Sequence, residues 1–267
     1  NGAQTALLYP YYYVKMLYEG LQDAGETEII SLTRAAYPGS QKYGAAVWNG
    51  DIVSDWNALR QSVTSGLSMG MCGIPWWNSD IGGFLSGDTL SDDFRELIVR
   101  WFQFGLFSPI MRLHGSRLRT PDQPEPNPGI IERSGGPNEI WAFGDENYTI
   151  IKKLIETREK LRPYIMKYMD IASKTGSPVM RPMFYDFHED EVCYTLEDQY
   201  TFGEDILFAP IMERGQVERK VYLPEGSWIS VIDHKTYTGK QWITVHAELD
   251  QYIAFVKENS DVLDVFQ

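Results

Sequence analysis

The sequence predicts an α/β domain over residues 1–177, followed by a small all-β sandwich over residues 178–267. Short apolar runs alternate with helical patterns in the first part, and polar residues follow each of those runs. From about Ser177 the runs become closely spaced and are separated by turn residues. Alternating strands and helices imply parallel strands, because parallel neighbours need crossover connections that are usually helical.

The first predicted elements are a helix and two short strands. Residues 6–24 carry apolar side chains at helical spacing and stop at a glycine, which favours the left-handed conformation that ends helices. The β-branched run 28–32 leads into Arg34. The run 43–48 leads into an Asn-Gly-Asp turn that ends at Asp51. Both runs indicate buried strands with polar residues at their ends.

The same order of elements is then repeated twice. Residues 55–70 place apolar side chains at four-residue steps and predict a helix, which is followed by an apolar run over 71–77. A second helix is expected over 91–107, because it begins with acidic residues favoured at a helix N-terminus. The run 109–113 then predicts a fourth strand, which brings Arg112 and His114 to its end.

Polar side chains follow all four predicted strands at their carboxyl ends. In α/β folds this is the face where ligands bind and catalysis occurs. Carboxylates and Arg hydrogen-bond to sugar hydroxyls, aromatic rings pack on the apolar face of a sugar, and a protonated carboxyl group can donate its proton to a glycosidic oxygen. The residues are Arg34, Asp51, Asp80 and His114, accompanied by Trp48, Trp76, Trp77, Phe84 and Trp101.

Each of these residues also has a purely structural interpretation. Asp51 after Asn-Gly and Asp80 before Ile-Gly-Gly could each be a turn or N-cap residue. His114 could be a core histidine, and Arg34 could be a salt-bridge partner. The adjacent tryptophans 76–77 would point to opposite faces of a strand, so at most one of them can face a site.

A long loop and a long helix complete the α/β part. Residues 117–147 form a Pro/Gly-rich polar segment whose length predicts a flap beside the site, and this segment holds Trp141 and Phe143. The helix expected over 146–174 has a predicted kink at Pro163 and a predicted stop at a glycine. After it, six short alternating runs between residues 206 and 257 predict the antiparallel sandwich.

Composition and charge exclude several classes of function. With 24 basic and 37 acidic residues the net charge is 24 − 37 = −13, so we expect neither nucleic acid nor an anionic membrane as partner. No stretch of about 18 uncharged apolar residues is present, and no signal peptide pattern begins the chain, so we expect a cytoplasmic protein. Phosphate-binding glycine loops, HExxH and GxSxG motifs are absent.

The cysteines and histidines predict no metal site. Two cysteines, Cys72 and Cys193, cannot build a disulfide framework or a Cys-based zinc site, and we expect both to be buried thiols. The four histidines show no close metal-ligand pairing.

Several long motifs stand in order along the chain. They are RAAYPGSQKYGAAVWNGD at 34–51, GIPWWNSDIGGF at 73–84, RWFQFGLFSPIMRLHGSR at 100–117, and QYTFGEDILFAPI and VYLPEGSWISV in the tail. Together they resemble glycoside hydrolase family 31, the retaining α-glucosidases and α-xylosidases. The resemblance covers essentially the whole chain. It implies the second half of a (β/α)8 TIM barrel followed by the family's proximal C-terminal β-sandwich.

The resemblance also implies roles for individual residues. Asp51 matches the general acid/base, and a cleft lined by Trp rings would keep its carboxyl group protonated near neutral pH. No metal or organic cofactor is implied, because carboxylates suffice for this chemistry. The residues that match the sugar subsite are Arg34, Trp48, Asp80 and His114, with Trp77 and Phe84 as its apolar wall.

One catalytic group is expected outside these residues. Retaining enzymes need two carboxylates about 5 Å apart, and the family's nucleophile is an Asp at the end of the fourth barrel strand. The opening NGAQTALLYP resembles the helix after that strand. We therefore expect the nucleophile in an upstream half of the same enzyme, which would also cover the strand edges and apolar surface of a lone half barrel.

The expected function is exo-acting hydrolysis of terminal α-linked xylose or glucose from an oligosaccharide, and the doubled Trp favours xylose. Two alternatives stay open. The chain could be a non-catalytic carbohydrate-binding fragment, or the β-sandwich could have a structural or assembly role.

Overall fold

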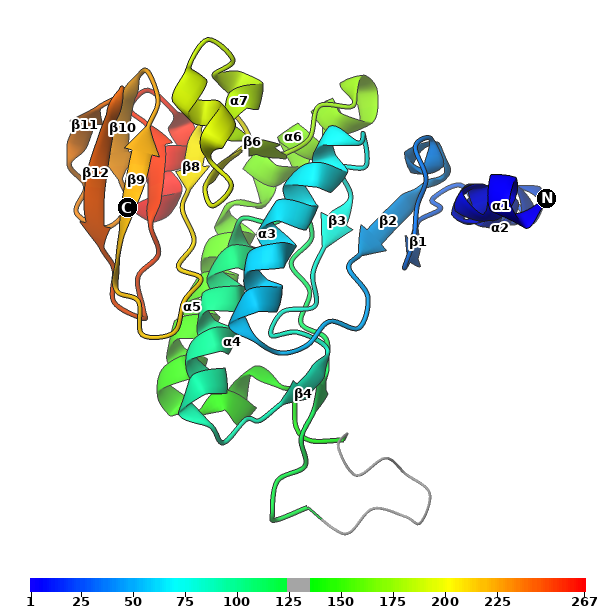
Figure 1. The fold of residues 1–267 in the computed structure, drawn as a ribbon, viewed down its shortest axis with the longest axis horizontal. Helices are drawn as coiled ribbons and strands as arrows, with labels where there is room; N and C mark the ends of the chain where they lie inside the picture. Colours follow the sequence, from blue (N-terminus) through cyan, green and yellow to red (C-terminus); the bar gives the residue numbers. More distant parts are fainter. Residues whose placement is uncertain (124–134) are drawn as a thin grey trace.

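The computed structural model of the chain describes residues 1–123 and 135–267. Figure 1 shows the β-sandwich on one side, the long helices in the middle and the N-terminal segment on the far side. The α-helices are α1 (Gly2–Thr5), α2 (Tyr9–Asp23), α3 (Trp56–Met71), α4 (Asp92–Leu106), α5 (Asp145–Lys160), α6 (Arg162–Thr175) and α7 (Met183–Asp186). The strands are β1 (Ser31–Thr33), β2 (Ala45–Trp48), β3 (Trp77–Asn78), β4 (Leu85–Gly87), β5 (Ser116–Arg117), β6 (Met180–Pro182), β7 (Tyr200–Phe202), β8 (Ile206–Phe208), β9 (Glu218–Leu223), β10 (Ser227–Ser230), β11 (Thr236–Thr238), β12 (Gln241–His246) and β13 (Ala254–Lys257).

The predicted parallel strands lie side by side. β1, β2 and β3 form one parallel sheet in chain order. The segment 109–113 continues beside β3, where the Ile110 N–H donates to the Trp77 carbonyl at 3.2 Å and Leu113 forms a parallel bridge with Ile81. The third strand was predicted too early, over 71–77, because α3 runs on to Met71.

Local signals place the helices close to where the sequence predicts them. The Asp55 carboxylate caps α3 by accepting from the Ala58 N–H at 2.7 Å, and Ser91 caps α4 in the same way. The expected kink near Pro163 is confirmed as a break between α5 and α6 at Leu161. Helix α6 ends at a left-handed glycine with φ 79°.

Helix α4 lies at the centre of the hydrophobic core. Eleven of its fifteen residues are buried. Its Phe104 ring meets Tyr200 of β7 at 6.4 Å, and Phe107, directly after the helix, meets Phe208 of β8 at 4.4 Å. One continuous apolar cluster therefore joins the α/β part to the sandwich across the predicted boundary between residues 177 and 178.

The C-terminal part forms an antiparallel sandwich. A six-stranded sheet has the order β11-β10-β13-β8-β7-β6, and β12 pairs with β9 in a second sheet. A second apolar cluster contains Trp228, Leu223 and Phe255 from these sheets. The six predicted runs correspond to β8–β13, whereas β6 and β7 were not anticipated.

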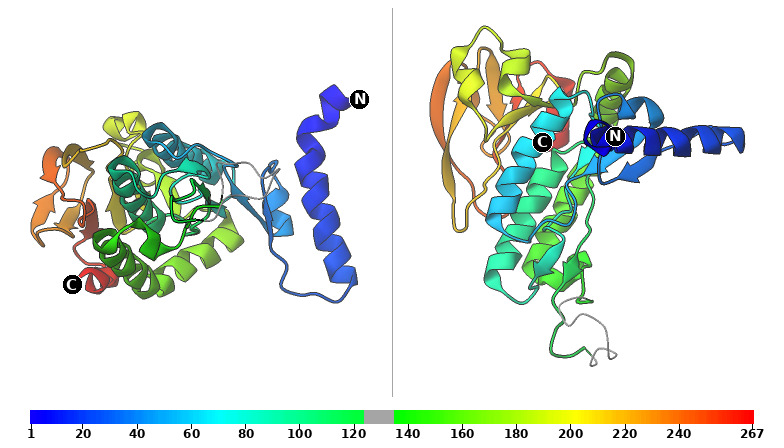
Figure 2. Two further views of the ribbon diagram at one scale, coloured as in Figure 1. Left: turned by 90° about the horizontal axis from the view of Figure 1, so that it is seen from below. Right: turned by 45° about the vertical axis from the view of Figure 1, so that its right-hand side comes forward.

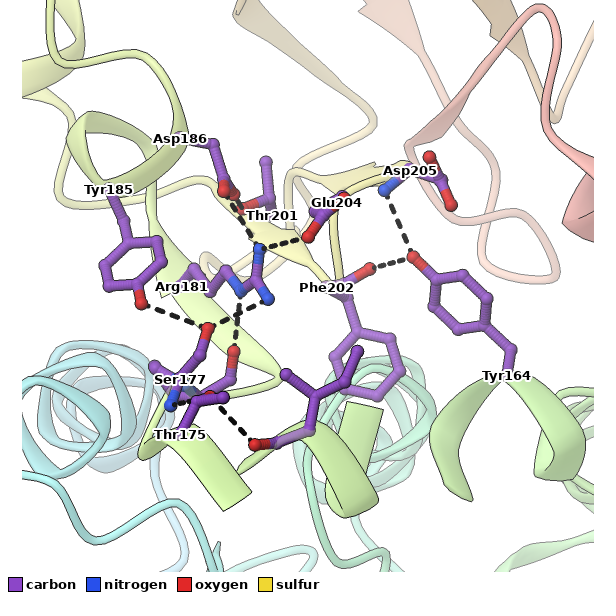
Figure 3. A network of polar contacts seen from close by, with 12 residues as sticks. Tyr164, Thr175, Ser177, Arg181, Tyr185, Asp186, Thr201, Phe202, Glu204 and Asp205 are labelled. Carbon is purple, nitrogen blue, oxygen red and sulfur yellow. Dashed lines mark hydrogen bonds and ion pairs between the residues drawn. The ribbon is translucent and has the colours of Figure 1, made fainter. Parts of the chain in front are cut away.

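A polar network fastens α6 to the six-stranded sheet (Figure 3). Arg181 is buried and donates to the Pro178 carbonyl at 2.6 Å and to the Asp186 carboxylate at 2.9 Å. The Tyr164 hydroxyl on α6 donates to the carbonyl of Phe202 at 2.8 Å and accepts from the Asp205 N–H at 3.1 Å. These contacts hold the helices and the sandwich in one arrangement.

The N-terminal helices stand apart from the rest of the chain. Figure 2 shows α1 and α2 beside the edge of the parallel sheet, away from the helical layer. Val14 is the one buried residue of α2, and it packs with Tyr43 and Ala45. The exposed apolar side chains of this segment are Leu7, Tyr9, Tyr12, Tyr13, Met16 and Leu21.

The two thiols differ in environment. Cys193 is buried in the sandwich core, as expected. The prediction that Cys72 is also buried is wrong, because this residue follows the last turn of α3 and faces solvent.

Candidate active site

The four polar residues at the predicted strand ends do reach one edge of the parallel sheet. Arg34 directly follows β1, and Asp51 lies in the turn after β2. Asp80 follows β3, and His114 follows the bridge residue Leu113. Because these strands run parallel in one order, their carboxyl ends present all four residues on the same face.

Arg34 and Asp51 form an ion pair on this face. The Arg34 Nη2 lies 3.4 Å from the Asp51 Oδ2, and the two side chains are 61% and 42% exposed. Gly50, with φ 78°, makes room for this contact, since a Cβ there would lie 3.3 Å from Arg34 Nη2. The expected enclosure of Asp51 by Trp rings is not met in this chain, because the carboxyl group stays open to solvent.

Asp80 lies deeper and is paired with Arg112. The Asp80 carboxylate is fully buried and accepts a short charged hydrogen bond from the Arg112 Nη1. Burial raises the pKa of the Asp80 carboxyl, while Arg112 and His114 oppose that rise. Its second oxygen, Oδ2, is buried and has no hydrogen-bond partner among the described residues. Asp80 thus orients Arg112, and its direct contact with a sugar stays a prediction.

Aromatic rings flank this pair of charges. The Arg112 guanidinium lies 5.8 Å from the centre of the Trp48 ring. The rings of Phe84 and His114 lie 5.3 Å apart at an angle of 32°. Trp48 and Phe84 are half-buried and His114 is exposed. These three rings therefore border the polar residues and leave part of their own surface accessible to a ligand.

Trp77 does not belong to the site. The prediction that it forms part of the apolar wall is wrong: its side chain is 2% exposed and packs behind the strand against α3 and α4. A Cβ on Gly66 would lie 2.8 Å from its ring, and the Phe104 ring is 6.2 Å away. Strand alternation turns the neighbouring Trp76 to the opposite face, where it lines an apolar cavity of about 560 Å³.

Sequence reasoning placed Arg112 at the end of the fourth predicted strand but assigned it no role in the site. It lies two residues before His114 on the same extended segment. Side chains two apart on a strand point to the same face, so this spacing was the available signal.

The predicted flap over 117–147 lies partly outside the described residues, at 124–134. Of its two aromatic residues, Phe143 is buried and meets Phe94 at 6.0 Å, whereas Trp141 is exposed. Phe143 therefore belongs to the core and not to a flap surface.

The described residues offer neither a membrane-spanning helix nor a cluster of metal ligands. No helix in residues 1–123 and 135–267 is long and apolar enough to cross a membrane. The same residues contain no group of three or more His, Cys, Asp or Glu side chains placed to hold a metal ion.

Two family models match the chain. Residues 1–168 match the glycosyl hydrolases family 31 TIM-barrel domain, and residues 176–261 match the glycosyl hydrolase family 31 C-terminal domain. The chain belongs to glycoside hydrolase family 31. The predicted family is thereby confirmed, as is the predicted architecture of a TIM-barrel part followed by a β domain.

Relatives with known activities cover nearly the whole chain. An α-xylosidase of Saccharolobus solfataricus is 34% identical over 97% of this chain and 33% of its own length. A sulfoquinovosidase of Escherichia coli is 32% identical over 100% of this chain and 38% of its own length. The chain therefore spans about a third of the length of these curated relatives.

Solved structures show the same fold. A family 31 α-xylosidase from a soil metagenome, complexed with xylose, is 47% identical with a TM-score of 0.91, over 97% of this chain and 39% of that one. A family 31 dextranase of Flavobacterium johnsoniae, complexed with glucose, is 35% identical with a TM-score of 0.86, over 97% and 31%.

Proposed function

We propose that these residues form the acid/base side of the active site of a retaining exo-α-glycosidase. The observation that carries the proposal is the accessible Asp51 carboxyl beside Arg34, at the strand edge that also holds Asp80, Arg112 and His114. It is supported by membership of a family of glycoside hydrolases. An acid/base must reach both a glycosidic oxygen and a water molecule, and Asp51 has the exposure that this requires.

Asp51 acts twice in the proposed reaction. Protonated Asp51 first gives its proton to the glycosidic oxygen while the bond from that oxygen to the anomeric carbon breaks and a carboxylate nucleophile binds the carbon. The Asp51 carboxylate then takes a proton from water as the water oxygen attacks the anomeric carbon and releases the nucleophile. Arg34 stabilises the negative charge that Asp51 carries between these steps.

The catalytic nucleophile does not lie among the described residues near Asp51 in this proposal. Asp80 is the carboxylate whose charge interacts with Asp51, but it is buried and held by Arg112. A nucleophile must reach the anomeric carbon of the bound sugar, and the Asp80 side chain has no exposed surface from which to do so. We therefore assign the nucleophile to an upstream part of the same polypeptide.

That upstream part would also complete the barrel. Among the described residues β1 pairs with β2 alone, and Leu32 on β1 is exposed. At the opposite edge, Met111 and Leu113 line the apolar cavity together with Trp76. Apolar surface and unpaired strand edges of this kind favour burial against further strands.

The proposed substrates are oligosaccharides ending in α-linked xylose, with glucose as the second choice. Xylose is supported by the doubled Trp of the sequence and by the 47% identity to the xylose-bound α-xylosidase. Measured kcat/KM for an aryl α-xyloside and the matching α-glucoside would rank the two. A cytoplasmic location, and the absence of nucleic-acid and membrane partners, stay predictions that rest on the sequence and its net charge of −13.

The test of the proposed function is Asp51→Asn in the full polypeptide that contains these residues. General acid/base catalysis contributes on the order of 10² to 10⁴ in rate, so hydrolysis of an oligosaccharide should fall by that range. An aryl glycoside needs little protonation of its leaving group, and azide needs no general base, so azide should restore turnover and yield a glycosyl azide of retained configuration. Asp170→Asn is the matched control, because Asp170 on α6 is also exposed and ion-paired, with Lys174, and lies outside the segments that carry the proposed site. Unchanged hydrolysis by Asp51→Asn would refute the assignment.

A non-catalytic carbohydrate-binding role is the second candidate. The observation that favours it is that Asp80, the carboxylate whose charge acts on Asp51, is fully buried and paired with Arg112. Sugar binding without turnover by the full polypeptide would support it.

A further inference from the structure

Arg117 is a fully enclosed charge beside the candidate site. Its side chain is fully buried and its guanidinium lies 4.9 Å from the centre of the Phe94 ring. All three of its nitrogens donate hydrogen bonds. The acceptors are the Asn138 Oδ1 at 2.7 Å, the Ser54 Oγ at 3.3 Å and the carbonyl oxygens of Ile81 at 3.1 Å, Gly82 at 3.4 Å and Gly83 at 2.8 Å.

These acceptors belong to the loops that carry the proposed site residues. The acid/base loop (51–55) begins with Asp51 and contributes Ser54. The glycine loop (81–87) directly follows Asp80 and contributes three carbonyls. Arg117 itself lies in the histidine loop (114–118), which begins with His114. One side chain thus contacts all three loops.

Backbone contacts bind the same three loops into one layer. Ser54 donates its N–H to the Leu85 carbonyl at 3.0 Å, which joins the acid/base loop to the glycine loop. Ser116 and Leu118 donate to the carbonyls of Phe84 and Gly87 at 2.7 and 2.9 Å, which joins the histidine loop to the glycine loop. The Arg117 guanidinium lies beneath this layer and supplies its side-chain links.

Three glycines leave the space that the guanidinium occupies. A Cβ on Gly115 would lie 2.6 Å from the Arg117 Nη1, and one on Gly82 would lie 2.8 Å from Nη2. A Cβ on Gly87 would lie 2.9 Å from the Arg117 Cδ. The glycine and histidine loops are therefore shaped around this side chain.

The charge of Arg117 has no carboxylate partner within ion-pair distance among the described residues. Burial lowers the pKa of Arg117 to about 10, and the Asp80 charge opposes that shift. A buried charge of this kind is costly unless its hydrogen bonds are satisfied, which the carbonyl, hydroxyl and amide acceptors achieve. A planar guanidinium can bridge several such acceptors at once, whereas a lysine ammonium cannot.

We propose that Arg117 is the positioning residue that fixes the acid/base loop, the glycine loop and the histidine loop relative to one another, so that Asp51 is aimed at the leaving glycosidic oxygen. The inference rests on the proposed function of Asp51. Arg117 touches no substrate in this role and acts through Ser54 and the carbonyls after Asp80.

The experiment compares Arg117→Lys with the wild type in the full polypeptide, using two substrates. Displacement of Asp51 impairs proton donation, which an alkyl α-xyloside needs and a 4-nitrophenyl α-xyloside hardly needs. A misplacement of about 1 Å can cost on the order of a hundredfold in rate, so kcat/KM should fall about tenfold further for the alkyl than for the aryl substrate. Ser54→Ala, which removes only the link to the acid/base loop, should shift the same ratio less. If Arg117→Lys folds poorly, the Ser54→Ala variant still tests whether the link to the acid/base loop affects the ratio of the two rates.

Arg100→Lys is the matched control. Arg100 on α4 is also buried, also donates to backbone carbonyls, at Glu248, Gln251 and Ala247, and also has its pKa lowered to about 10. These contacts join α4 to the β-sandwich, away from the proposed site. Loss of folded enzyme reduces both rates equally, so Arg100→Lys should leave the alkyl-to-aryl ratio unchanged. An equal fall for both substrates in Arg117→Lys, or the same shift in Arg100→Lys, would overturn the proposal.

Hydrogen exchange separates this proposal from the proposed function. If the wild type hydrolyses neither these xylosides nor the matching α-glucosides, the proposed function fails, and the amides of Ser54 and Leu118 still report whether Arg117 fixes the loops. Their exchange should accelerate about tenfold in Arg117→Lys and not in Arg100→Lys, because local opening sets the rate. Unchanged exchange would refute the positioning role regardless of activity.

Discussion

Helices α2 and α4 have the same length of fifteen residues and opposite environments. Both carry apolar side chains at helical spacing, yet α2 buries one residue and α4 buries eleven. Helix α4 lies between the parallel strands and the sandwich, whereas α2 packs against the 3-10 turn Ser40–Tyr43 and the adjoining edge of the parallel sheet. An apolar pattern therefore predicts a helix without saying what covers it. The uncovered side chains of α2 indicate the surface that an upstream barrel half would bury.

The two thiols give the largest expected contrast between closed core and open surface. Burial raises the pKa of the Cys193 thiol to about 12, so it stays protonated at neutral pH and its reactivity should rise only as pH approaches that value. Cys72 is exposed. We expect alkylation of Cys72 at pH 8 to be on the order of a thousandfold faster, measured by mass spectrometry of the folded chain. Comparable alkylation rates at the two thiols would contradict the burial of Cys193.

Truncation of an aromatic ring tests the closed core directly. Phe104→Ala on α4 should lower the free energy of unfolding by about 3–5 kcal/mol, because it leaves a cavity beside Trp77 and Tyr200. Tyr12→Ala on α2 is the matched change on the open side and should cost less than about 0.5 kcal/mol in this chain. Denaturant unfolding measures both values, and equal losses would remove the distinction between the two helices.

The helix N-cap supplies a smaller test. The Ser91 hydroxyl accepts from the Phe94 N–H at 3.2 Å at the start of α4. Ser91→Ala should cost about 1 kcal/mol, and Ser91→Asp should retain most of the stability, because Asp also caps helices well. A loss in Ser91→Asp as large as in Ser91→Ala would show that the cap does not act through this hydrogen bond.

The smallest change is expected on α2 itself when the upstream part is present. Tyr12→Ala should then become more costly than in the 267-residue chain, because its ring is exposed here and would be covered there. The two unfolding experiments, in the chain and in the full polypeptide, give the comparison. No difference would mean that the upstream part does not cover this helix.

Local patterns predicted the helices and the edge that carries the site. Helices over 55–70 and 91–107 match α3 and α4 within one residue at each end, because caps and apolar periodicity are both local signals. Arg34, Asp51, Asp80 and His114 reach one edge because parallel strands bring their carboxyl ends together. The short third strand was predicted too early, over 71–77. Its apolar run begins with the last residue of α3, and apolar residues alone do not show where the helix ends and the strand begins.

Local patterns did not predict which face of the sheet a side chain lies on, or which residues far apart in the sequence are in contact. Alternation shows that Trp76 and Trp77 point to opposite faces but not which face meets the helices, and Trp77 faces α3 and α4. Arg112 was predicted at a strand end, but its ion pair with Asp80 joins residues 32 positions apart and has no local signal. The contacts of Arg117 could not be predicted either, because most of its partners are backbone carbonyls, which have no sequence signature.

The most direct test of the central claim is to trap the reaction intermediate in the full polypeptide with a mechanism-based α-glycosyl fluoride and to map the labelled peptide by mass spectrometry. The account predicts a covalent label on an Asp outside residues 1–267, and no label on Asp51 or Asp80. A label on either of these residues, or on any other carboxylate of this chain, would contradict the assignment of the chain as the acid/base side of the site.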